Sequence, residues 1–204
     1  MKADIEFEPY VDAIWLGQNM PSSLLPVSRI DMHLFSYLAC IVSLLNGNAI
    51  NSWRYRYTIN DEGFPFSANF DEALSAAIRG GFFKDSLTGK LNFNQRKLSS
   101  ELEILKSIHR PSAKRFDHLS NSLRAALMLP IGQIRNSVSQ SVSTKEVYRK
   151  LDQRRFSFQD QDEIDSIYNE YRVVYEAFDE DPGELSPLIV WISSRLISIN
   201  KEFN

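Results

Sequence analysis

The sequence has little of the residues that most often carry metal and redox chemistry, with one cysteine and three histidines among 204 residues. A single cysteine cannot close a disulfide within the chain, so we expect a reducing, intracellular compartment. Cys40 lies in an apolar run and is interpreted as a small buried hydrophobic side chain. His33 lies in the same run, which indicates a core histidine. Neither HExxH nor paired CxxC spacing occurs, so no zinc ion or other cofactor is expected.

Motifs of nucleotide-binding and nucleophilic enzymes are also absent. The sequence contains no GxSxG elbow, no GxGxxG and no GxxxxGK[ST] loop. Acidic runs occur in "FDEDPGE" and "QDQDEID", but both are typical of solvated turns and helix ends. The second run also lacks the central glycine and terminal glutamate of a calcium loop. The sequence therefore predicts a binding protein rather than an enzyme, without catalytic or metal-binding residues.

Long hydrophobic runs are missing as well. The most apolar stretch, "MHLFSYLACIVSLL", has the length of a buried core helix and is shorter than the ~20 residues that span a bilayer. The first ten residues, "MKADIEFEPY", are acidic and have no apolar region of the kind that secretory signals require. We therefore expect a cytoplasmic protein that does not associate with membranes.

Charge is distributed unevenly along the chain. Residues 90–155 hold 14 lysines and arginines against 5 acidic residues, whereas residues 156–204 hold 3 against 11. Residues 1–89 are mildly acidic, with 6 basic and 10 acidic side chains. A basic middle beside an acidic end indicates a polyanion partner, a charged protein partner, or neutralisation of one segment by the other. All three alternatives stay open at this point.

What the sequence does contain is helical periodicity and one hairpin signal. Ile30 to Leu45 predicts a central helix, with Asp31 near its start and Asn46-Gly47 as its stop. "WRYRYTI", residues 53–59, alternates aromatic residues with arginines and predicts a strand. Ser67 is the expected N-cap of a helix that ends at Gly80-Gly81.

Strand-like residues follow the double glycine. Phe82–Lys84 and Lys90–Phe93, joined by the turn "DSLTGK", predict a β-hairpin. A helix over residues 95–108 is expected next, because Leu98, Leu102, Leu105 and Ile108 recur at helical spacing. Helices packed together and followed by a small hairpin are the winged-helix plan, a variant of the helix-turn-helix.

The second half of the chain predicts helices over residues 112–129, 144–152 and 160–178. "LIVWISSRLISI" is compatible with a helix or a β-branched strand, and its length and leucine spacing favour the helix. The first thirty residues contain Pro9, Pro21 and Pro26, which predicts an extended arm with a short helical piece. The expected fold is mainly α with a small β-hairpin: an N-terminal arm (1–29), a winged-helix-like domain (30–109) and a helical C-terminal region (110–204).

The stretch "WRYRYTINDEGFPFSANFDEALSAAIRGGFF", together with the apolar helix before it, resembles a group of prokaryotic winged-helix proteins. Those proteins carry an aromatic-rich strand, a turn in which proline precedes an aromatic residue and serine, a helix, and a glycine before a hydrophobic strand. Here the turn reads Gly63-Phe64-Pro65-Phe66-Ser67, with Phe64 between the glycine and the proline. The resemblance covers residues 30–95.

Within that group, the length of the chain, its N-terminal segment and its helical second half resemble the middle component of ABC three-component systems. Lamassu-type anti-phage defence is one such system. The resemblance implies a non-enzymatic accessory subunit that links or regulates an SMC-like ABC ATPase and an effector, often a nuclease. The alternative is a winged-helix transcriptional regulator that binds DNA.

Two sets of candidate contact residues follow from these hypotheses. DNA or another polyanion would be bound by the basic residues of the hairpin and the two helices after it, namely Lys84, Lys90, Arg96, Lys97, Arg110, Lys114 and Arg115. A protein partner would be bound by large apolar residues of the N-terminal arm and the C-terminal helix, namely Ile14, Trp15, Leu16 and Trp191.

Overall fold

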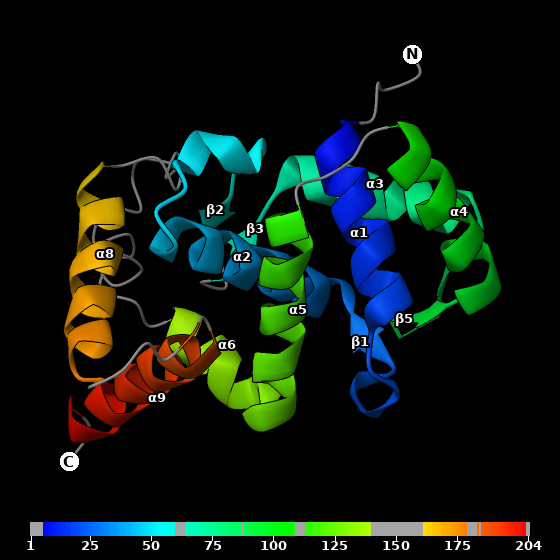
Figure 1. Ribbon diagram of the computed structural model, residues 1–204. Coiled ribbons are helices and arrows are strands. Elements are labelled where there is room, and N and C mark those ends of the chain that lie inside the picture. Colours follow the sequence, from blue (N-terminus) through cyan, green and yellow to red (C-terminus); the bar gives the residue numbers. More distant parts are fainter. Residues whose placement is uncertain are drawn as a thin grey trace, which may run out of the picture.

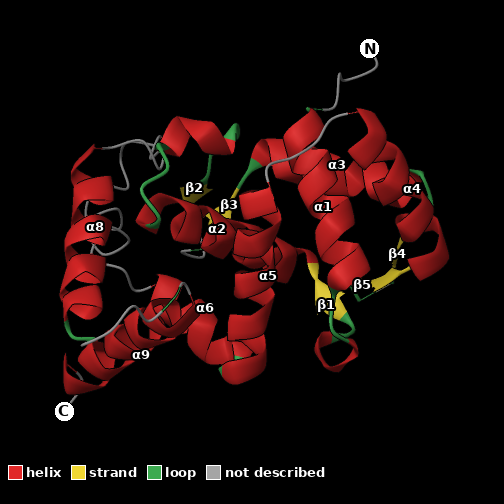
Figure 2. Ribbon diagram, viewed as in Figure 1, coloured by secondary structure: helices red, strands yellow, loops and turns green. Residues whose placement is uncertain are grey.

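The computed structural model describes residues 6–59, 64–86, 88–108, 113–139, 161–178, 183 and 185–202, and this part of the chain is mainly helical (Figures 1 and 2). Its α-helices are α1 (Phe7–Asn19), α2 (Arg29–Leu45), α3 (Ala68–Arg79), α4 (Gln95–Ile108), α5 (Ala113–Met128), α6 (Ile131–Ser139), α8 (Gln161–Glu176) and α9 (Leu185–Glu202). Its strands are β1 (Val27–Ser28), β2 (Thr58–Ile59), β3 (Pro65–Phe66), β4 (Phe83–Asp85) and β5 (Lys90–Phe93). Two short 3₁₀ helices, η1 (Ser22–Leu24) and η2 (Ile50–Trp53), complete the set.

Helix α2 begins at a capping box and ends at the predicted stop. The Ser28 hydroxyl accepts a hydrogen bond from the Asp31 backbone N–H, and the Asp31 carboxylate accepts one from the Ser28 backbone N–H. These reciprocal bonds satisfy two backbone donors that a free helix end would leave unpaired. Asn46 caps the other end, and Gly47 follows with a φ of 78°, a left-handed conformation that glycine adopts without steric cost. The predicted central helix is confirmed.

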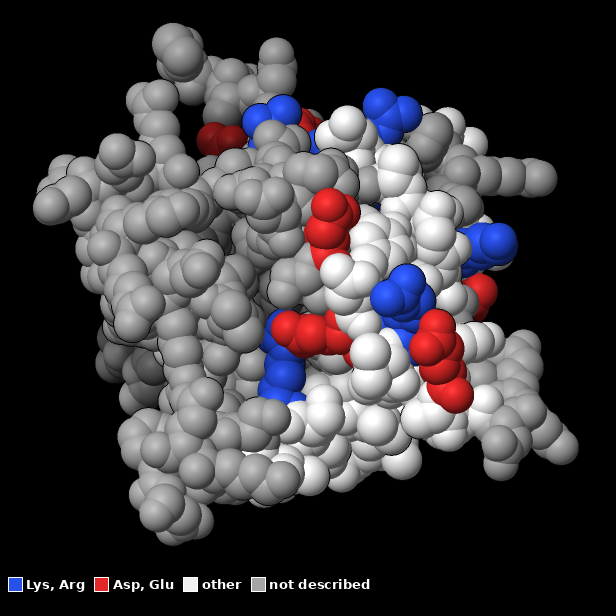
Figure 3. Space-filling model, turned by 90° about the vertical axis from the view of Figure 1, so that its left-hand side faces the viewer, with Lys and Arg blue, Asp and Glu red and all other residues white. Residues whose placement is uncertain are grey.

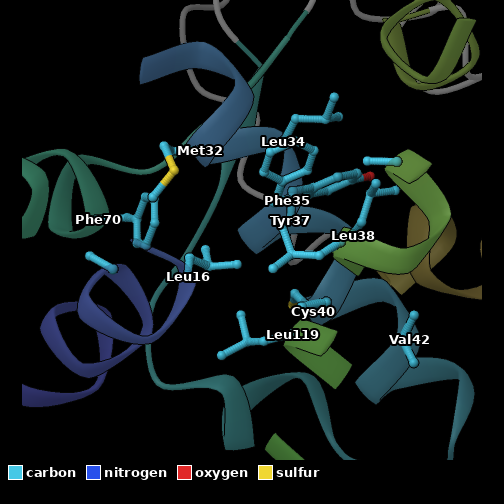
Figure 4. Packing of buried hydrophobic residues seen from close by; sticks show 14 of the residues in the cluster. Leu16, Met32, Leu34, Phe35, Tyr37, Leu38, Cys40, Val42, Phe70 and Leu119 are labelled. Atoms are coloured by element: carbon cyan, nitrogen blue, oxygen red, sulfur yellow. The ribbon is translucent and has the colours of Figure 1, made fainter. Parts of the chain in front are cut away.

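Other helices converge on α2 in the core. Leu16 from α1, Phe70 from α3 and Leu119 from α5 all lie near α2 in the core (Figure 4). Every α2 residue from Asp31 to Leu44 is buried, so α2 is covered on all sides rather than on one stripe. Cys40 is a buried free thiol within this helix, as the sequence predicts.

Residues 7–19 form helix α1, which contains the expected short helical piece and replaces most of the expected extended arm. The helix packs against α3 and α4, and Ile14 and Leu16 are fully buried there. A Cβ added at Gly17 would lie 2.5 Å from Cε1 of Phe83, so only glycine lets the β4 ring approach the helix this closely. The prolines misled the prediction because Pro9 lies in the first turn of α1, where a missing backbone N–H costs nothing.

A three-stranded antiparallel sheet has the order β1-β5-β4. Val27 of β1 pairs with Leu91 of β5, and Phe83 of β4 pairs with Phe93 on the other side of β5. The two phenylalanine rings meet edge to face, with centroids 4.9 Å apart. The predicted hairpin is therefore confirmed, with its first strand shifted by one residue, and β1 is a third strand that was not predicted from the sequence.

The predicted strand over residues 53–59 is wrong for most of its length. Residues 50–53 form η2, Arg54 has a φ of 76°, and only Thr58 and Ile59 pair with β3. The alternation that suggested a strand is nevertheless present in the burial of the side chains. The aromatic residues are buried and the arginines between them are exposed, in the order Trp53, Arg54, Tyr55, Arg56 and Tyr57. Alternating burial thus arises here in an irregular loop.

Helix α3 has the predicted cap and stop. The Ser67 hydroxyl accepts a hydrogen bond from the backbone N–H of Phe70. At the other end the chain leaves the helix at Gly80 and Gly81, and Gly81 has a φ of 70°. The following residues enter β4, so the double glycine turns the chain from helix into hairpin.

Helix α4 matches the predicted range. The Asn94 side chain accepts from the backbone N–H of Lys97 and caps the helix. Leu98, Leu102 and Leu105 are buried where α4 packs on α1. Ile108 was expected on the same stripe, but it is 70% exposed because it lies at the end of α4 beyond the contact with α1.

The second half of the chain adds α5, α6, α8 and α9. Helix α5 packs along α2, and α9 contacts α5, α6 and α8. The segment "LIVWISSRLISI" lies in α9, so the helical alternative is confirmed. Buried residues of α5 and α9, including Leu119, Leu123 and Trp191, belong to the same hydrophobic cluster as α1 and α2. The expected helix over residues 144–152 lies outside the described residues.

Candidate interaction surface

Arg115, a predicted DNA contact, lies in the interior between α5, α1 and the residues after η2. Its Nε and Nη2 atoms donate to the Asp12 carboxylate at 2.8 and 2.6 Å, and Nη2 also donates to the Trp53 carbonyl at 3.1 Å. The guanidinium lies 4.0 Å from the centroid of the Trp53 ring. Burial alone would lower the pKa of Arg115, but Asp12 outweighs burial and holds that pKa above its usual value. Arg115 is therefore not available to DNA, which corrects its place among the predicted contacts.

A chain of hydroxyl groups extends from Asp12 into the core. Tyr55 donates to Asp12 Oδ2 at 2.7 Å, and the Ser36 hydroxyl lies 2.5 Å from the Tyr55 hydroxyl and 2.6 Å from that of Tyr57. Because the Tyr55 proton points to Asp12, Ser36 must donate to Tyr55 and Tyr57 must donate to Ser36. Burial raises the pKa of both tyrosines. The whole network is buried and satisfied, so it joins α1, α2 and α5 rather than forming a site.

The predicted partner contacts in α1 and α9 are also mostly internal. Ile14 and Leu16 are fully buried, and Trp191 is 1% exposed. The Trp191 indole donates to Glu170 Oε2 at 3.0 Å, and the Arg195 guanidinium lies 4.1 Å from its ring centroid. These three side chains therefore cannot contact a partner without opening the core, which corrects the prediction for them.

Trp15 differs from its neighbours in α1 because it is only half-buried. Its ring stacks on Phe116 of α5, with centroids 5.6 Å apart and an angle of 11° between the ring planes. Most of its contact area is thus used within the chain, and Trp15 remains a candidate contact at its exposed edge.

His33 has the role of a core histidine, as the sequence predicts. Its Nδ1 accepts from the Ser67 backbone N–H at 3.3 Å, so the ring proton is on Nε2, which donates to Asp71 Oδ1 at 3.4 Å. Arg29 donates to the same Asp71 oxygen at 2.9 Å. The hydrogen bond from His33 is the main cause that lowers the pKa of Asp71, and burial opposes it. This cluster links α2 to α3.

The predicted basic contacts do not form one patch. Arg96 and Lys97 are exposed in the first turn of α4, and Lys84 and Lys90 lie on the adjoining hairpin. Lys114 is exposed at the start of α5, which begins near the opposite end of α4 (Figure 1). A helix of 14 residues is roughly 21 Å long, so α4 separates Lys114 from the other four cations. Arg110 lies outside the described residues.

Ion pairs of the described residues show which charged segments meet. Two arginines of the basic middle pair with acidic residues from the first segment, Arg115 with Asp12 and Arg135 with Asp31. In the acidic C-terminal segment, two glutamates form ion pairs with arginines of the same segment, in the pairs Arg195–Glu170 and Arg172–Glu176. Within the described ranges, no ion pair joins the basic middle to the acidic C-terminal segment. Among the described residues on the face shown in Figure 3, which is the α8 side of Figure 1, acidic and basic side chains are interspersed.

A hollow lies where α3, the hairpin and α4 meet. This pocket has a volume of about 530 Å³ and is open to solvent. Its walls come from the end of α3 and the following turn, from the residue that caps α4, and from three turns of α4: Gly80, Phe82, Asn94, Arg96, Lys97, Ser100, Glu101 and Ile104. We call it the α3–α4 pocket.

The double glycine shapes the α3–α4 pocket. A Cβ at Gly80 would lie 2.5 Å from the Phe82 ring, so glycine lets this ring fold back over the end of α3. A Cβ at Gly81 would lie 3.1 Å from Lys97 Nζ, and this ammonium group lies 3.5 Å from the Gly80 carbonyl oxygen. The glycines therefore make room for one aromatic ring and one cation at the pocket wall.

Apolar surface continues from the pocket along α4. Ile104 lines the pocket and is 53% exposed, and Ile108 lies one turn further on. Ile104 and Ile108 share one face of α4 because they are four residues apart. This surface is not among the contacts predicted from the sequence. The signal was present, since Ile104 falls outside the stripe formed by Leu98, Leu102 and Leu105.

The described residues offer no group of three or more histidine, cysteine, aspartate or glutamate side chains placed to hold a metal ion. No helix among them is both long enough and apolar enough to cross a bilayer. Comparisons with family models, with curated proteins and with solved structures find no match. The family expected from residues 30–95 therefore stays a prediction.

Proposed function

We propose that the chain is a non-enzymatic accessory subunit that binds other proteins through a winged-helix core. The winged-helix plan places a helix, a strand, two helices and a hairpin in that order. Apart from the short 3₁₀ helices and the β2-β3 pair inserted between α2 and α3, the order α1-β1-α2-α3-β4-β5 supports this plan, and so does the sheet order with β5 between β1 and β4. Helix α3 then corresponds to the helix that enters the major groove in DNA-binding members of this architecture.

The outer face of α3 is the observation that favours a protein partner over DNA. Glu72 is exposed on this face, whereas the half-buried Asp71 carboxylate is held by Arg29 and His33 of α2. Arg79 is the only basic residue in α3 and lies in its last turn. A DNA-reading helix needs donors for base edges and cations for phosphates, whereas the exposed Glu72 carboxylate repels the phosphate backbone.

The proposed partners are an SMC-like ABC ATPase and an effector, often a nuclease, of a prokaryotic anti-phage defence system. This part of the proposal rests on the sequence resemblance over residues 30–95. An accessory subunit of this kind needs surfaces for two proteins and no catalytic group of its own. The subunit would link the effector to the ATPase or hold the effector inactive.

Co-purification tests this function. A tagged copy is expressed at native level, and the bound material is identified before and after nuclease treatment. We expect an ATPase and an effector that remain bound after nuclease treatment. Recovery of DNA alone, which disappears on nuclease treatment, would overturn the proposal.

The alternative, a DNA-binding regulator, is favoured by one observation: four basic residues lie around the hairpin, namely Lys84, Lys90, Arg96 and Lys97. It predicts binding to duplex DNA at low salt that weakens in the double variant Arg96→Ala/Lys97→Ala. The logarithm of affinity should then depend less steeply on the logarithm of salt concentration, by about 0.9 for each phosphate group that the variant no longer neutralises. Arg124→Ala, at an exposed cation of α5, is the matched control.

A further inference from the structure

We propose that the α3–α4 pocket binds an acidic peptide segment of a partner protein, with one large apolar side chain inserted between Phe82 and Ile104. The inference rests on the proposed function, because it names the surface and the chemistry by which an accessory subunit would hold its partner. It assigns the pocket to a peptide rather than to DNA or to a second copy of the chain.

The pocket combines an apolar wall with cations, and this combination selects the ligand. Phe82 and Ile104 supply the wall, and the pocket volume of about 530 Å³ exceeds what a single large side chain fills. Ile108 extends the apolar surface by one turn and is 70% exposed. A phosphate backbone would leave this apolar surface unused, whereas a peptide with a leucine or an aromatic anchor buries it.

The charges that line the pocket indicate the net charge of the bound peptide segment. Arg96 and Lys97 line the pocket, and in the described part of the chain neither forms an ion pair with a carboxylate. Glu101 is the one acidic lining residue, and its Oε1 accepts from the Tyr10 hydroxyl at 3.1 Å, on the α1 side of α4. The backbone N–H groups at the start of α4 add partial positive charge next to the two cations. An acidic segment therefore fits this rim better than a neutral or basic one.

The probe is a library of random 16-residue peptides displayed on phage and selected against the full-length chain. Peptides that also bind an unrelated immobilised protein are removed. We expect the remaining peptides to carry net negative charge and at least one leucine, phenylalanine or tryptophan. Synthetic copies of them are then measured by fluorescence anisotropy.

Two variants and a control locate the binding. Arg96→Glu/Lys97→Glu should weaken peptide affinity about tenfold or more, and Ile104→Asp should abolish measurable binding. Arg124→Glu reverses an exposed cation of α5 outside the pocket and should leave affinity unchanged. All four positions are exposed, so the thermal unfolding midpoints of the variants should match that of the parent chain.

Three outcomes would overturn the inference. The first is a selection that yields no peptides, or peptides without acidic character. The second is binding of a 20-base-pair DNA duplex that is abolished in Arg96→Glu/Lys97→Glu and absent for peptides, which would assign the pocket to DNA. The third is a dimer in solution, detected by light scattering, that Ile104→Asp dissociates.

The selection does not depend on the native partner. If the selection fails but the chain still co-purifies with an ATPase, only the peptide-binding role of the pocket is refuted. If the selection succeeds but no ATPase co-purifies, only the proposed function is refuted.

Discussion

Replacing Asp12 by alanine is expected to destabilise the protein more than replacing any surface acid. Asp12 is fully buried and accepts two hydrogen bonds from Arg115 and one from Tyr55. The variant removes the carboxylate that accepts two hydrogen bonds from the buried Arg115 guanidinium and one from the Tyr55 hydroxyl. Removal of one partner of a buried ion pair costs about 3–5 kcal/mol.

This magnitude is a large fraction of the stability of a typical domain, which is about 5–15 kcal/mol. Urea unfolding followed by far-UV circular dichroism measures the free energy of unfolding. With an m-value of about 2 kcal/mol/M, the midpoint of Asp12→Ala should fall by about 2 M. Asp117→Ala removes an exposed acid of α5 and should leave the midpoint nearly unchanged.

A second substitution separates the cost of the unpaired charge from the loss of packing. Asp12→Ala/Arg115→Met removes both charges and keeps an unbranched apolar side chain beside Trp53. The double variant should be more stable than Asp12→Ala, because no buried charge is left unpaired. A loss below about 1 kcal/mol for Asp12→Ala would refute the reasoning, and so would a double variant no more stable than Asp12→Ala.

Three further predictions concern packing and pH. Gly17→Ala should destabilise the protein by about 1–3 kcal/mol, measured by urea unfolding, because the added Cβ meets the Phe83 ring; an unchanged midpoint would contradict this prediction. Burial raises the pKa of Tyr55 and Tyr57, so their contribution to stability is complete below about pH 10 and is lost as the pH rises through the folded-state values. The free energy of unfolding should therefore fall above pH 10 more steeply in the parent chain than in Tyr57→Phe, and equal slopes would contradict the assignment. The pKa of Asp71 is lowered, so its contribution is present above about pH 4 and is lost as the pH falls further; Asp71→Asn should flatten this acid dependence in the same assay.

Local signals in the sequence predict α2, α3 and α4 well. The range of α4 and the cap and stop of α3 follow from side chains that satisfy backbone groups within a few residues. Such signals depend only on the chain within one or two turns, so they can be identified without the tertiary structure. The hairpin is predictable for the same reason, because its turn and its alternating strands are adjacent in the sequence.

Features that depend on distant residues could not be predicted in this way. Strand β1 is only two residues long and exists because β5, more than sixty residues later, offers it a free edge. Arg115 has the sequence context of a surface cation, and only the fold brings Asp12 next to it across 103 positions. Ile14 and Leu16 belong to an amphipathic segment whose partners, α3 and α4, follow much later in the chain. Whether a charged or apolar residue is buried thus depends on which distant element packs against it.

The α3–α4 pocket depends both on local sequence signals and on contacts between residues that are distant in the sequence. Gly80 and Gly81 end α3 through local backbone preference, and the same glycines leave the space that Phe82 and Lys97 occupy. A residue with a side chain at either position would strain the turn or displace a pocket wall. The stop signal of one helix therefore also determines the shape of the surface beside the next helix. A binding role for this surface requires no catalytic group, which agrees with a sequence whose main chemical signal is the distribution of its charges.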